Sequence, residues 1–432
     1  MVDFSIDPDF EKQLEWVREF VATEVEAMDL VFDDMSAPYD RSNKAARAAL
    51  APLQAEVKRR GLWAAHLPKH DGGAGIGQVN LLYLNEILGR TDWGPVVFGC
   101  QGPDSGNSEI LAAFGTDEQK MRYLEPLVAG DVYSCFSMTE PTGGADPTRL
   151  KTRAVQDGDD WVITGDKWYA SHAQFAEFII VAAVTDPDAE AHQRNTLFIV
   201  PRGTPGLEIV REIGFFGEPE GVGGHPYIRF NGLRLPDSAR LGGVGQGFAV
   251  AQSRLGGGRI HHAMRAIGVC QKMIDMMTER SVSREVAGGR LIDKQSVQND
   301  LASSAIALRQ FRFQVLHAAW MFDNNLGHGR EGRLAVAMVK VATADITKDV
   351  VWKAMHMHGA LGTSNEMPFG KYLGLAAMFG IADGPTEVHL SSVAKALTRG
   401  VEPHPGFFPS EHLPTRRMAA RAKLAPFVEA NA

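Results

Sequence analysis

The sequence predicts an α+β protein in which a central β domain separates two helical regions. Apolar residues recur at helical spacing up to about residue 132, and short β-branched segments follow closely on one another from 133 to 246. Long apolar-periodic segments then extend from 247 to 400. Consecutive strands without intervening helices favour an antiparallel barrel or sandwich. We therefore expect domains at 1–132, 133–246 and 247–400, followed by a tail at 401–432.

The N-terminal region is predicted to be helical because its apolar residues lie three and four positions apart. One such stripe consists of Leu14, Val17, Phe20, Val21 and Val25. This spacing places them on one face of a helix. The segments "LLYLNEILGR", "SEILAAFG" and "MRYLEPLVAG" have similar patterns, and each ends near glycine, a usual helix stop.

The central region is predicted to consist of strands. Its segments "WVITGDKWYAS", "FIIVAAVT", "NTLFIVP", "LEIV" and "YIRFNGLRL" are short and rich in β-branched and aromatic residues. Asp, Gly, Pro and Asn separate them, as expected for turns. The sequence "QDGDDW" predicts a hairpin turn.

The C-terminal region is predicted to be a helical bundle, because its periodic segments are long. We expect helices at Phe248–Arg280, Ser296–Asn325, Arg333–His358 and Glu387–Arg399. The tail after Gly400 carries four prolines before a short basic segment, "TRRMAARAKL".

The composition excludes several classes of protein. With 44% apolar and 22% charged residues, the 432-residue chain resembles an average soluble protein. Its net charge of -8 disfavours a nucleic-acid or anionic-membrane partner. The apolar run "FIIVAAV" is too short to span a bilayer, and the acidic N-terminus lacks the pattern of a secretory signal. Three widely spaced cysteines favour reduced thiols, so we expect a cytoplasmic protein.

Glycine and histidine clusters do not predict a nucleotide fold or a metal site. The clusters "GGAGIG" and "GGVGQG" lack the glycine spacing of a Rossmann fingerprint. The histidines of "HMH" and "HH" are one or two residues apart, so they do not share a helix face. No partner has zinc-like spacing, and we interpret these residues as ordinary polar or core histidines. The sequence also lacks the Gly-x-Ser-x-Gly motif of serine hydrolases.

Two segments of the central region suit a ligand. In "CFSMTEPTGGADPTRL", a strand ends near Thr139 and enters a Pro-Gly-Gly loop, whose N–H groups and hydroxyls suit carbonyls and phosphates. In "GDKWYASHA", Trp168 and Tyr169 precede Ser171. Neighbours on a strand point to opposite faces, so one ring can pack inside while the other meets a flat ligand. Core packing alone explains this aromatic pair equally well.

Two C-terminal segments each have two interpretations. The segment "RLGGGRIHHAMRAIG" opens a helix with three glycines and two arginines, which favours a phosphate site or, alternatively, a glycine hinge with surface charges. In "IADGPTEVHL", Asp383 lies in a Gly-Pro turn before a helix. It is either an ordinary turn residue or a catalytic base.

Taken together, the chain resembles the acyl-CoA dehydrogenase family up to about Arg399. The motifs "SMTEP", "GDKWYAS", "LGGGRIHHAMRAIG", "HGALGTSNEMP" and "ADGPTEVH" follow one another in the family's order and spacing. "GRIHHAMR" and "ADGPTEVH" are most similar to the branch of acyl-CoA dehydrogenase family members ten and eleven and their bacterial relatives.

The resemblance implies an activity, a cofactor and partners. We expect FAD bound without a Rossmann fold, and oxidation of an acyl-CoA thioester to the trans-2-enoyl-CoA. In that reaction a carboxylate removes the α proton and the β hydrogen leaves as hydride to flavin N5. The resemblance further implies reoxidation by an electron-transfer flavoprotein and a homodimer or homotetramer.

The resemblance also implies the residues around the reacting carbons. Asp383 stands at the position of the base, where most members have Glu before a Gly-Thr turn. Its own N–H would polarise the thioester oxygen. Such a base is expected to need a pKa raised by desolvation in apolar surroundings. Arg259 and Gly384 are assigned to substrate binding.

The cofactor contacts follow by position in the motifs. Met138 and Thr139 would meet the pyrimidine side of the flavin, Tyr169 would lie against the ring, and Ser171 would bond near O4 and N5. Residues expected at the pyrophosphate and ADP part, some of them reaching a neighbouring subunit's FAD, are Arg284, Gln295, His356, Gly359 and Thr386. Ala145, His356 and Ala287 depart from common family residues.

Two alternatives remain open at this point. A flavin monooxygenase or an acyl-CoA oxidase could be built on the same fold. A non-catalytic, flavin-poor binding subunit is the other alternative, and the three departures favour it.

Overall fold

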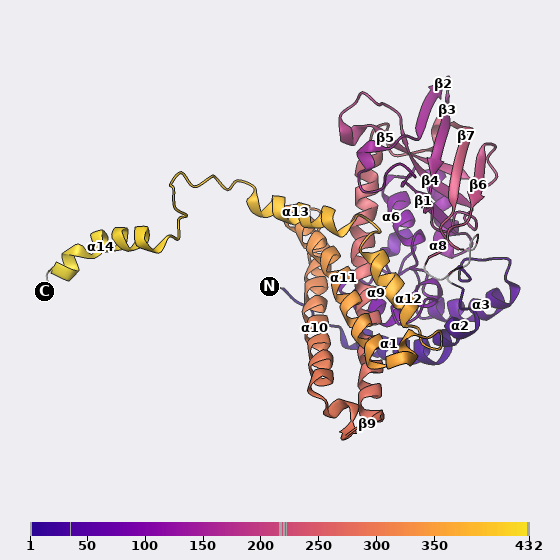
Figure 1. Cartoon of the computed structure of the whole chain (residues 1–432). Coiled ribbons are helices and arrows are strands. Elements are labelled where there is room, and N and C mark those ends of the chain that lie inside the picture. Colours follow the sequence, from indigo (N-terminus) through magenta and orange to yellow (C-terminus); the bar gives the residue numbers. More distant parts are fainter. Residues whose placement is uncertain (1, 35, 216–217, 219–220, 222, 430–432) are drawn as a thin grey trace. The chain divides into compact units, whose positions relative to one another are not determined.

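The computed structural model describes residues 2–34, 36–215, 218, 221 and 223–429. Two compact units divide the chain, Met1–Leu390 and Ser391–Ala432, and each is described by itself. In the first unit the strands gather at one end, and the long helices of the C-terminal region run side by side (Figure 1). This arrangement confirms the predicted order of a helical region, a β region and a second helical region.

The N-terminal region is helical, as predicted. Its first helix begins after Asp7, whose carboxylate accepts hydrogen bonds from the N–H groups of Asp9 and Phe10. Leu14 and Val17 of the predicted stripe are fully buried. The helices are α1 (Pro8–Phe20), α2 (Glu26–Val31), α3 (Lys44–Arg59), α4 (Gln78–Leu88), α5 (Gly94–Val97), α6 (Asp104–Phe114), α7 (Asp117–Gln119) and α8 (Glu125–Ala129).

The central region forms one sheet with the strand order β6-β7-β3-β2-β4-β5-β8, and β1 pairs with β4. The predicted hairpin is confirmed, since Asp157 pairs with Asp160 across a turn that contains Gly158 at φ +65°. The strands are β1 (Ser134–Ser137), β2 (Arg153–Asp157), β3 (Asp160–Lys167), β4 (Phe178–Val184), β5 (Asn195–Pro201), β6 (Leu207–Arg211), β7 (Tyr227–Pro236) and β8 (Arg240–Leu241).

The sheet departs from the antiparallel expectation at one place. Both β1 and β2 pair with β4 in parallel, whereas the remaining pairs are antiparallel. Parallel neighbours need a long connection. The strand periodicity does not reveal which strand is brought beside β4 by such a connection.

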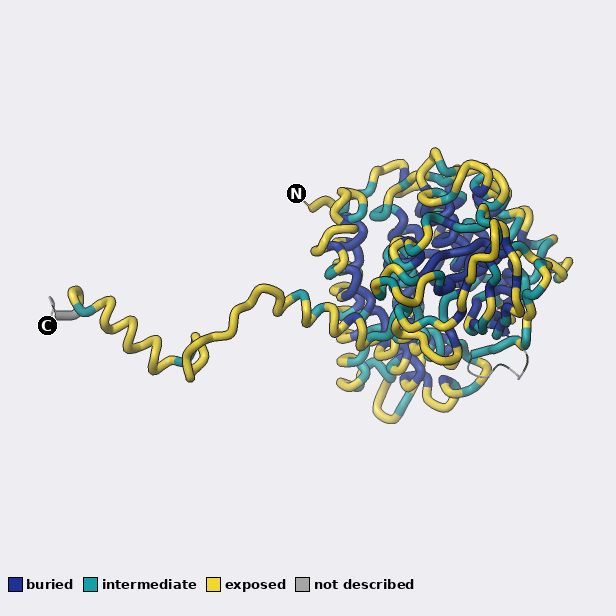
Figure 2. The backbone as a smooth tube through the Cα atoms, turned by 90° about the horizontal axis from the view of Figure 1, so that it is seen from above, coloured by how far each residue is buried: buried dark blue, intermediate teal, exposed yellow. Residues whose placement is uncertain are grey.

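Strand β4 is buried on both faces, which explains its uninterrupted apolar sequence. Ile179, Val181 and Ala183 belong to a core within the β region. The alternate residues Phe178 and Ile180 belong to a second core, shared with helices α6 and α8. The sheet is therefore covered on both sides, and the dark, buried segments lie inside the first unit (Figure 2).

The C-terminal bundle begins with α9 (Gly247–Ser283), which packs against α4, α10 and α11. A short β9–β10 hairpin (Glu285–Val286 and Gly289–Arg290) leads to α10 (Gln295–Asp323), α11 (Arg330–Met357), α12 (Phe369–Phe379) and α13 (Thr386–Thr398). The four predicted helices begin and end within three residues of α9, α10, α11 and α13. Helix α12 was not predicted, because its sequence is apolar on nearly every side.

One hydrophobic core joins the two helical regions. It contains residues from Phe10 to Tyr133 and from Ile260 to Phe379. Where α4 crosses α9, a Cβ on Gly268 would lie 2.1 Å from the carbonyl oxygen of Glu86. The two helices therefore touch backbone to backbone at this point. The boundaries proposed at 133, 247 and 401 remain a prediction.

The second unit contains the end of α13 and helix α14 (Leu413–Glu429). The predicted basic segment lies in α14, and Phe407 before it is 95% exposed. None of the helices that the structure describes is both long and apolar enough to cross a membrane.

Candidate active site

Asp383 lies in the turn between α12 and α13 in a left-handed conformation, with φ at +56°. Asp and Asn are the non-glycine residues that adopt this conformation most readily. The carboxylate is largely buried, with 19% of its surface exposed. Asp383 therefore is a turn residue, and the turn directs its side chain into the protein.

In the backbone of this turn, the carbonyl oxygen of Asp383 has hydrogen-bond partners, whereas two N–H groups have none among the described residues. Arg259 Nε donates a hydrogen bond of 2.9 Å to the carbonyl oxygen of Asp383. His389 Nε2 lies 3.4 Å from the same oxygen. Among the described residues, the N–H groups of Asp383 and Gly384 have no hydrogen-bond acceptor. These two donors remain available to a ligand.

One face of α9 lies opposite the carboxylate. Arg254, Gly258, His262 and Arg265 follow one another at spacings of four, four and three, which places them on one side of the helix. His262 Nε2 lies 3.6 Å from Asp383 Oδ2. A Cβ on Gly258 would lie 3.6 Å from the same oxygen, so the missing side chain leaves room for the carboxylate.

Positive groups surround Asp383 from two helices. Arg254 and Arg259 come from α9. Lys340 comes from α11, is 3% exposed, and donates a hydrogen bond to the carbonyl oxygen of Phe379. We refer to Asp383, Arg254, Arg259, His262 and Lys340 as the Asp383 cluster.

The expected high pKa of Asp383 is wrong for this structure. Burial raises its pKa, but the neighbouring His262, Arg254, Arg259 and Lys340 together outweigh burial and hold the pKa below its ordinary value. The surroundings are cationic rather than apolar. Asp383 is therefore ionised at neutral pH.

Burial shifts the pKa values of two other titratable groups near Asp383 so that their neutral forms are favoured. Burial, with the added effect of Arg265, lowers the pKa of His262 to about 4, so its imidazole is neutral at pH 7. Burial also raises the pKa of the Glu109 carboxyl to about 8, against the opposing charge of Arg254. Two nearby carboxyl groups thus hold different protonation states at neutral pH.

The loop after β1 and the end of β3 are tied together. The carbonyl oxygen of Met138 accepts a hydrogen bond of 2.7 Å from Lys167 Nζ, and that of Thr139 accepts one of 3.1 Å from the N–H of Trp168. Lys167 Nζ also lies 2.9 Å from Glu140 Oε1, and both side chains are almost completely buried. The predicted "SMTEP" and "GDKWYAS" segments therefore lie against each other.

Tyr169 and Ser171 lie beyond the strand on which we expected them. Strand β3 ends at Lys167, and a left-handed turn at Tyr169, with φ at +50°, rather than strand alternation, directs its ring outward. The Tyr169 ring is 46% exposed and lies 4.9 Å from that of Trp168. Ser171 Oγ lies 2.8 Å from His225 Nδ1.

The residues in this region fit a flavin. Tyr169 offers an exposed flat ring, and Trp168 Nε1 is buried without a hydrogen-bond partner. Within the described part of the chain, the N–H groups of Gly144, Ala145 and Ser171 also lack an acceptor. Unpaired N–H groups at such a site suit the carbonyl, ring nitrogen and phosphate groups of a flavin nucleotide.

A third group of predicted residues lies at the other end of α9. Arg284 caps this helix, and a Cβ on Gly359 would lie 3.5 Å from Arg284 Nη1. Gln295 begins α10, and the exposed His356 lies 4.4 Å from Trp352, ring to ring. Arg284 and Arg259 are 25 residues apart along α9, which corresponds to about 37 Å. Thr386, by contrast, donates to the carbonyl oxygen of Gly380 beside the Asp383 turn.

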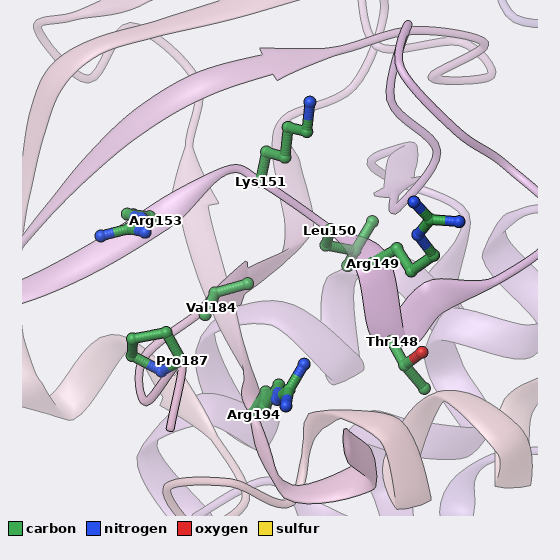
Figure 3. A pocket seen from close by; sticks show the side chains of 8 residues that line it. All are labelled: Thr148, Arg149, Leu150, Lys151, Arg153, Val184, Pro187 and Arg194. Carbon is green, nitrogen blue, oxygen red and sulfur yellow. The ribbon is translucent and has the colours of Figure 1, made fainter. Parts of the chain in front are cut away.

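The structure also contains a basic pocket of about 570 Å³ (Figure 3). The first residues that line it come shortly after Thr139 in the chain. Its lining consists of Thr148, Arg149, Leu150, Lys151, Arg153, Val184, Pro187 and Arg194. Four of these eight residues are cationic and none is acidic. None of the four forms an ion pair with a described carboxylate. The pocket therefore favours an anionic ligand.

Sequence reasoning did not single out His262, Lys340, Glu109 or the basic pocket. His262 was interpreted as an ordinary histidine, although it lies three residues after Arg259 and therefore near it on the helix. Lys340 and Glu109 carry no local signal, since their positions depend on how α11 and α6 pack. No group of metal ligands occurs among the described residues.

Comparisons with known proteins match most of the chain. Family models described as acyl-CoA dehydrogenase N-terminal, middle and C-terminal domains match residues 7–131, 135–229 and 245–398. The Mycobacterium tuberculosis protein named "Probable acyl-CoA dehydrogenase FadE2" is 37% identical over 88% of this chain and 93% of its own. A solved structure of this kind from Mycobacterium abscessus is 35% identical, covers 90% of this chain and 98% of its own, and has a TM-score of 0.83.

The vertebrate relatives are longer proteins. "Acyl-CoA dehydrogenase family member 11" of Rattus norvegicus is 36% identical over 79% of this chain. The match covers 44% of that relative, so this chain spans less than half of its length.

Proposed function

The chain belongs to the acyl-CoA dehydrogenase family, and we propose that it is an FAD-dependent enzyme that oxidises an acyl-CoA thioester to its trans-2-enoyl-CoA. The observation that carries the proposal is Asp383. Its carboxylate is largely buried and ionised, and free backbone donors lie in the same turn. A base and a donor for the developing oxyanion are thus held by one turn.

In this reaction Asp383 accepts the proton from the α carbon as that C–H bond breaks. Bound FAD would accept, as a hydride, the hydrogen that leaves the β carbon. The N–H of Asp383 hydrogen-bonds the thioester oxygen, where negative charge develops. Arg254, Arg259 and Lys340 stabilise that charge, because they exceed the ionised carboxylate in number.

The low pKa of Asp383 has a role before the chemical step. It keeps the base ionised while substrate enters. A bound acyl chain would then exclude water from the Asp383 cluster, which makes the carboxylate more basic. We therefore propose two steps in order. The cations of the Asp383 cluster first keep the Asp383 carboxylate ionised, and the bound substrate then desolvates it.

The chain's flavin site combines residues from two subunits. Met138, Thr139, Tyr169 and Ser171 would hold the ring, and Thr386 would lie towards the adenosine or pyrophosphate. Arg284, Gln295, His356 and Gly359 would hold the ADP part of a neighbouring subunit's FAD. The separation of about 37 Å between Arg284 and Arg259 favours this division. A homodimer or homotetramer follows, reoxidised by an electron-transfer flavoprotein.

The basic pocket supports a coenzyme A thioester over a free acid. Its four cations complement the phosphates at the nucleotide end of coenzyme A. The pocket begins at Thr148, in the same loop as the residues assigned to the flavin. Substrate and cofactor would thus approach the loop from its two ends.

The test is an anaerobic titration of the purified protein with a panel of acyl-CoAs, followed by flavin absorbance. Bleaching by one class of acyl-CoA would establish the half-reaction and identify the substrate. Asp383→Asn is expected to retain flavin and to lose bleaching. Asn tolerates the left-handed turn, so this variant removes the base without changing the backbone.

Three other results would favour the alternatives. A flavin-containing protein that no acyl-CoA bleaches, but that consumes oxygen when reduced, would be a monooxygenase. Bleaching followed by rapid reoxidation in air would indicate an acyl-CoA oxidase. A protein that binds no flavin after reconstitution would be a non-catalytic subunit.

A further inference from the structure

We propose that His262 is a positioning residue for Asp383, held by Arg265 so that its Nε2–H faces the carboxylate. The proposal rests on the proposed function, in which Asp383 is the base. It assigns a role to a histidine that the reaction itself does not use.

The direction of the hydrogen bonds follows from Arg265. A guanidinium group has donors and no acceptor. Arg265 Nη2 lies 3.4 Å from His262 Nδ1, so this nitrogen must accept and carries no proton. In a neutral imidazole the proton is then on Nε2. That nitrogen lies 3.6 Å from Asp383 Oδ2.

The surroundings keep the imidazole neutral. Arg265 and Arg254 face it from its own helix and Lys340 from α11. Arg259 from α9 and His389 from α13 contact the carbonyl oxygen of the adjacent Asp383 turn. His261 lies beside it in the chain. Protonation would add a positive charge to this group, and Asp383 is the carboxylate that faces it.

The geometry gives His262 one task. With Nδ1 occupied by Arg265, it has no free lone pair and cannot itself remove a proton. Its Nε2–H can donate to Asp383 Oδ2 once the carboxylate turns slightly, since 3.6 Å exceeds a hydrogen bond and active-site contacts often tighten with substrate. Oδ1 is then left to accept the α proton.

The variants His262→Leu and His262→Gln separate this role from packing. Leu fills the space without a donor. Gln can repeat the same polarity, because its oxygen accepts from Arg265 and its amide N–H faces Asp383. The buried His66, whose Nε2 lies 3.0 Å from Ser108 Oγ, provides His66→Leu as the matched control. The assay is the rate of flavin bleaching by an active acyl-CoA from about pH 3 to 9, a range that includes the acidic limb of a carboxyl whose pKa is held below its ordinary value.

Asp383 must be ionised to act, so the rate falls as the pH drops through its pKa. A lost donor destabilises the carboxylate and raises that pKa. We expect His262→Leu to move the acidic limb up by about one pH unit and to slow bleaching at its plateau about tenfold. His262→Gln should restore both, and His66→Leu should lower only the melting temperature.

An unchanged acidic limb and plateau in flavin-loaded His262→Leu would overturn the proposal. So would a limb that shifts equally in His262→Gln or in His66→Leu, because the effect would then be one of packing. Failure of the proposed function gives a different result, since either no acyl-CoA would bleach the native protein or Asp383→Asn would still be bleached. Flavin content and melting temperature, measured for every variant, exclude misfolding as the cause.

Discussion

Asp383→Glu is expected to impair this protein strongly, although Glu is the base in most of the family. The substitution lengthens the side chain by one C–C bond, about 1.5 Å. The present carboxylate oxygen already has His262 Nε2 at 3.6 Å. A longer side chain must therefore move the carboxylate away from its present position.

The size of the effect follows from two contributions. A displacement of about 1 Å at a reacting group costs about 100-fold in rate, equivalent to about 2.7 kcal/mol. Asp383 also occupies a left-handed conformation at φ +56°, where Glu is less tolerated than Asp. That strain adds at most about 1 kcal/mol to the destabilisation of the fold.

The assay is stopped-flow measurement of flavin bleaching under anaerobic conditions, with melting temperature measured in parallel. Asp383→Glu should bleach about 100-fold more slowly while retaining its flavin. Asp383→Asn serves as the control, since it keeps the turn but removes the base. Bleaching by Asp383→Glu within about threefold of the native rate would refute the argument that this turn fixes the carboxylate.

Two further predictions concern stability. Lys167→Met should destabilise the fold by about 3–5 kcal/mol, because it leaves Glu140 buried without its cation. The double variant Lys167→Met with Glu140→Gln should recover part of this loss in denaturant melts. Equal stability of Lys167→Met and the native protein would contradict the prediction. On α9, Gly256→Ala should stabilise by about 0.5–1 kcal/mol, since nothing lies within 4 Å of the new Cβ, whereas Gly268→Ala should destabilise through its contact with the Glu86 carbonyl. Similar melting temperatures for these two alanine variants would show that the α4–α9 crossing can open.

The order of the regions was predictable because each local pattern has a single explanation. The stripe around Leu14 can only be buried as a helix, and the separated apolar runs from Trp161 onward suit strands. Helix α12 was missed since "FGKYLGLAAMF" is apolar on nearly all sides and gives no period. The parallel pairing of β1 with β4 was missed because it depends on a long connection.

The residues of the site were predictable by motif, but their electrostatics were not. Asp383, Arg259 and Gly384 were expected together, and the structure brings them together. The low pKa of Asp383 depends on Arg254 and Lys340, which are far from it in sequence and reach it only through the packing of α9 and α11. Desolvation can be anticipated from a single buried residue, whereas the balance of charges needs the assembled bundle.

The shared helical core has a consequence for how the chain is made. Residues from Phe10 to Tyr133 bury their apolar faces against residues from Ile260 to Phe379. During synthesis, the first helices therefore leave the ribosome well before their packing partners exist. Until then their apolar stripes stay exposed, a condition that promotes aggregation and engages chaperones. The β region between them has a core of its own and can therefore fold before the N-terminal helices reach their packing partners.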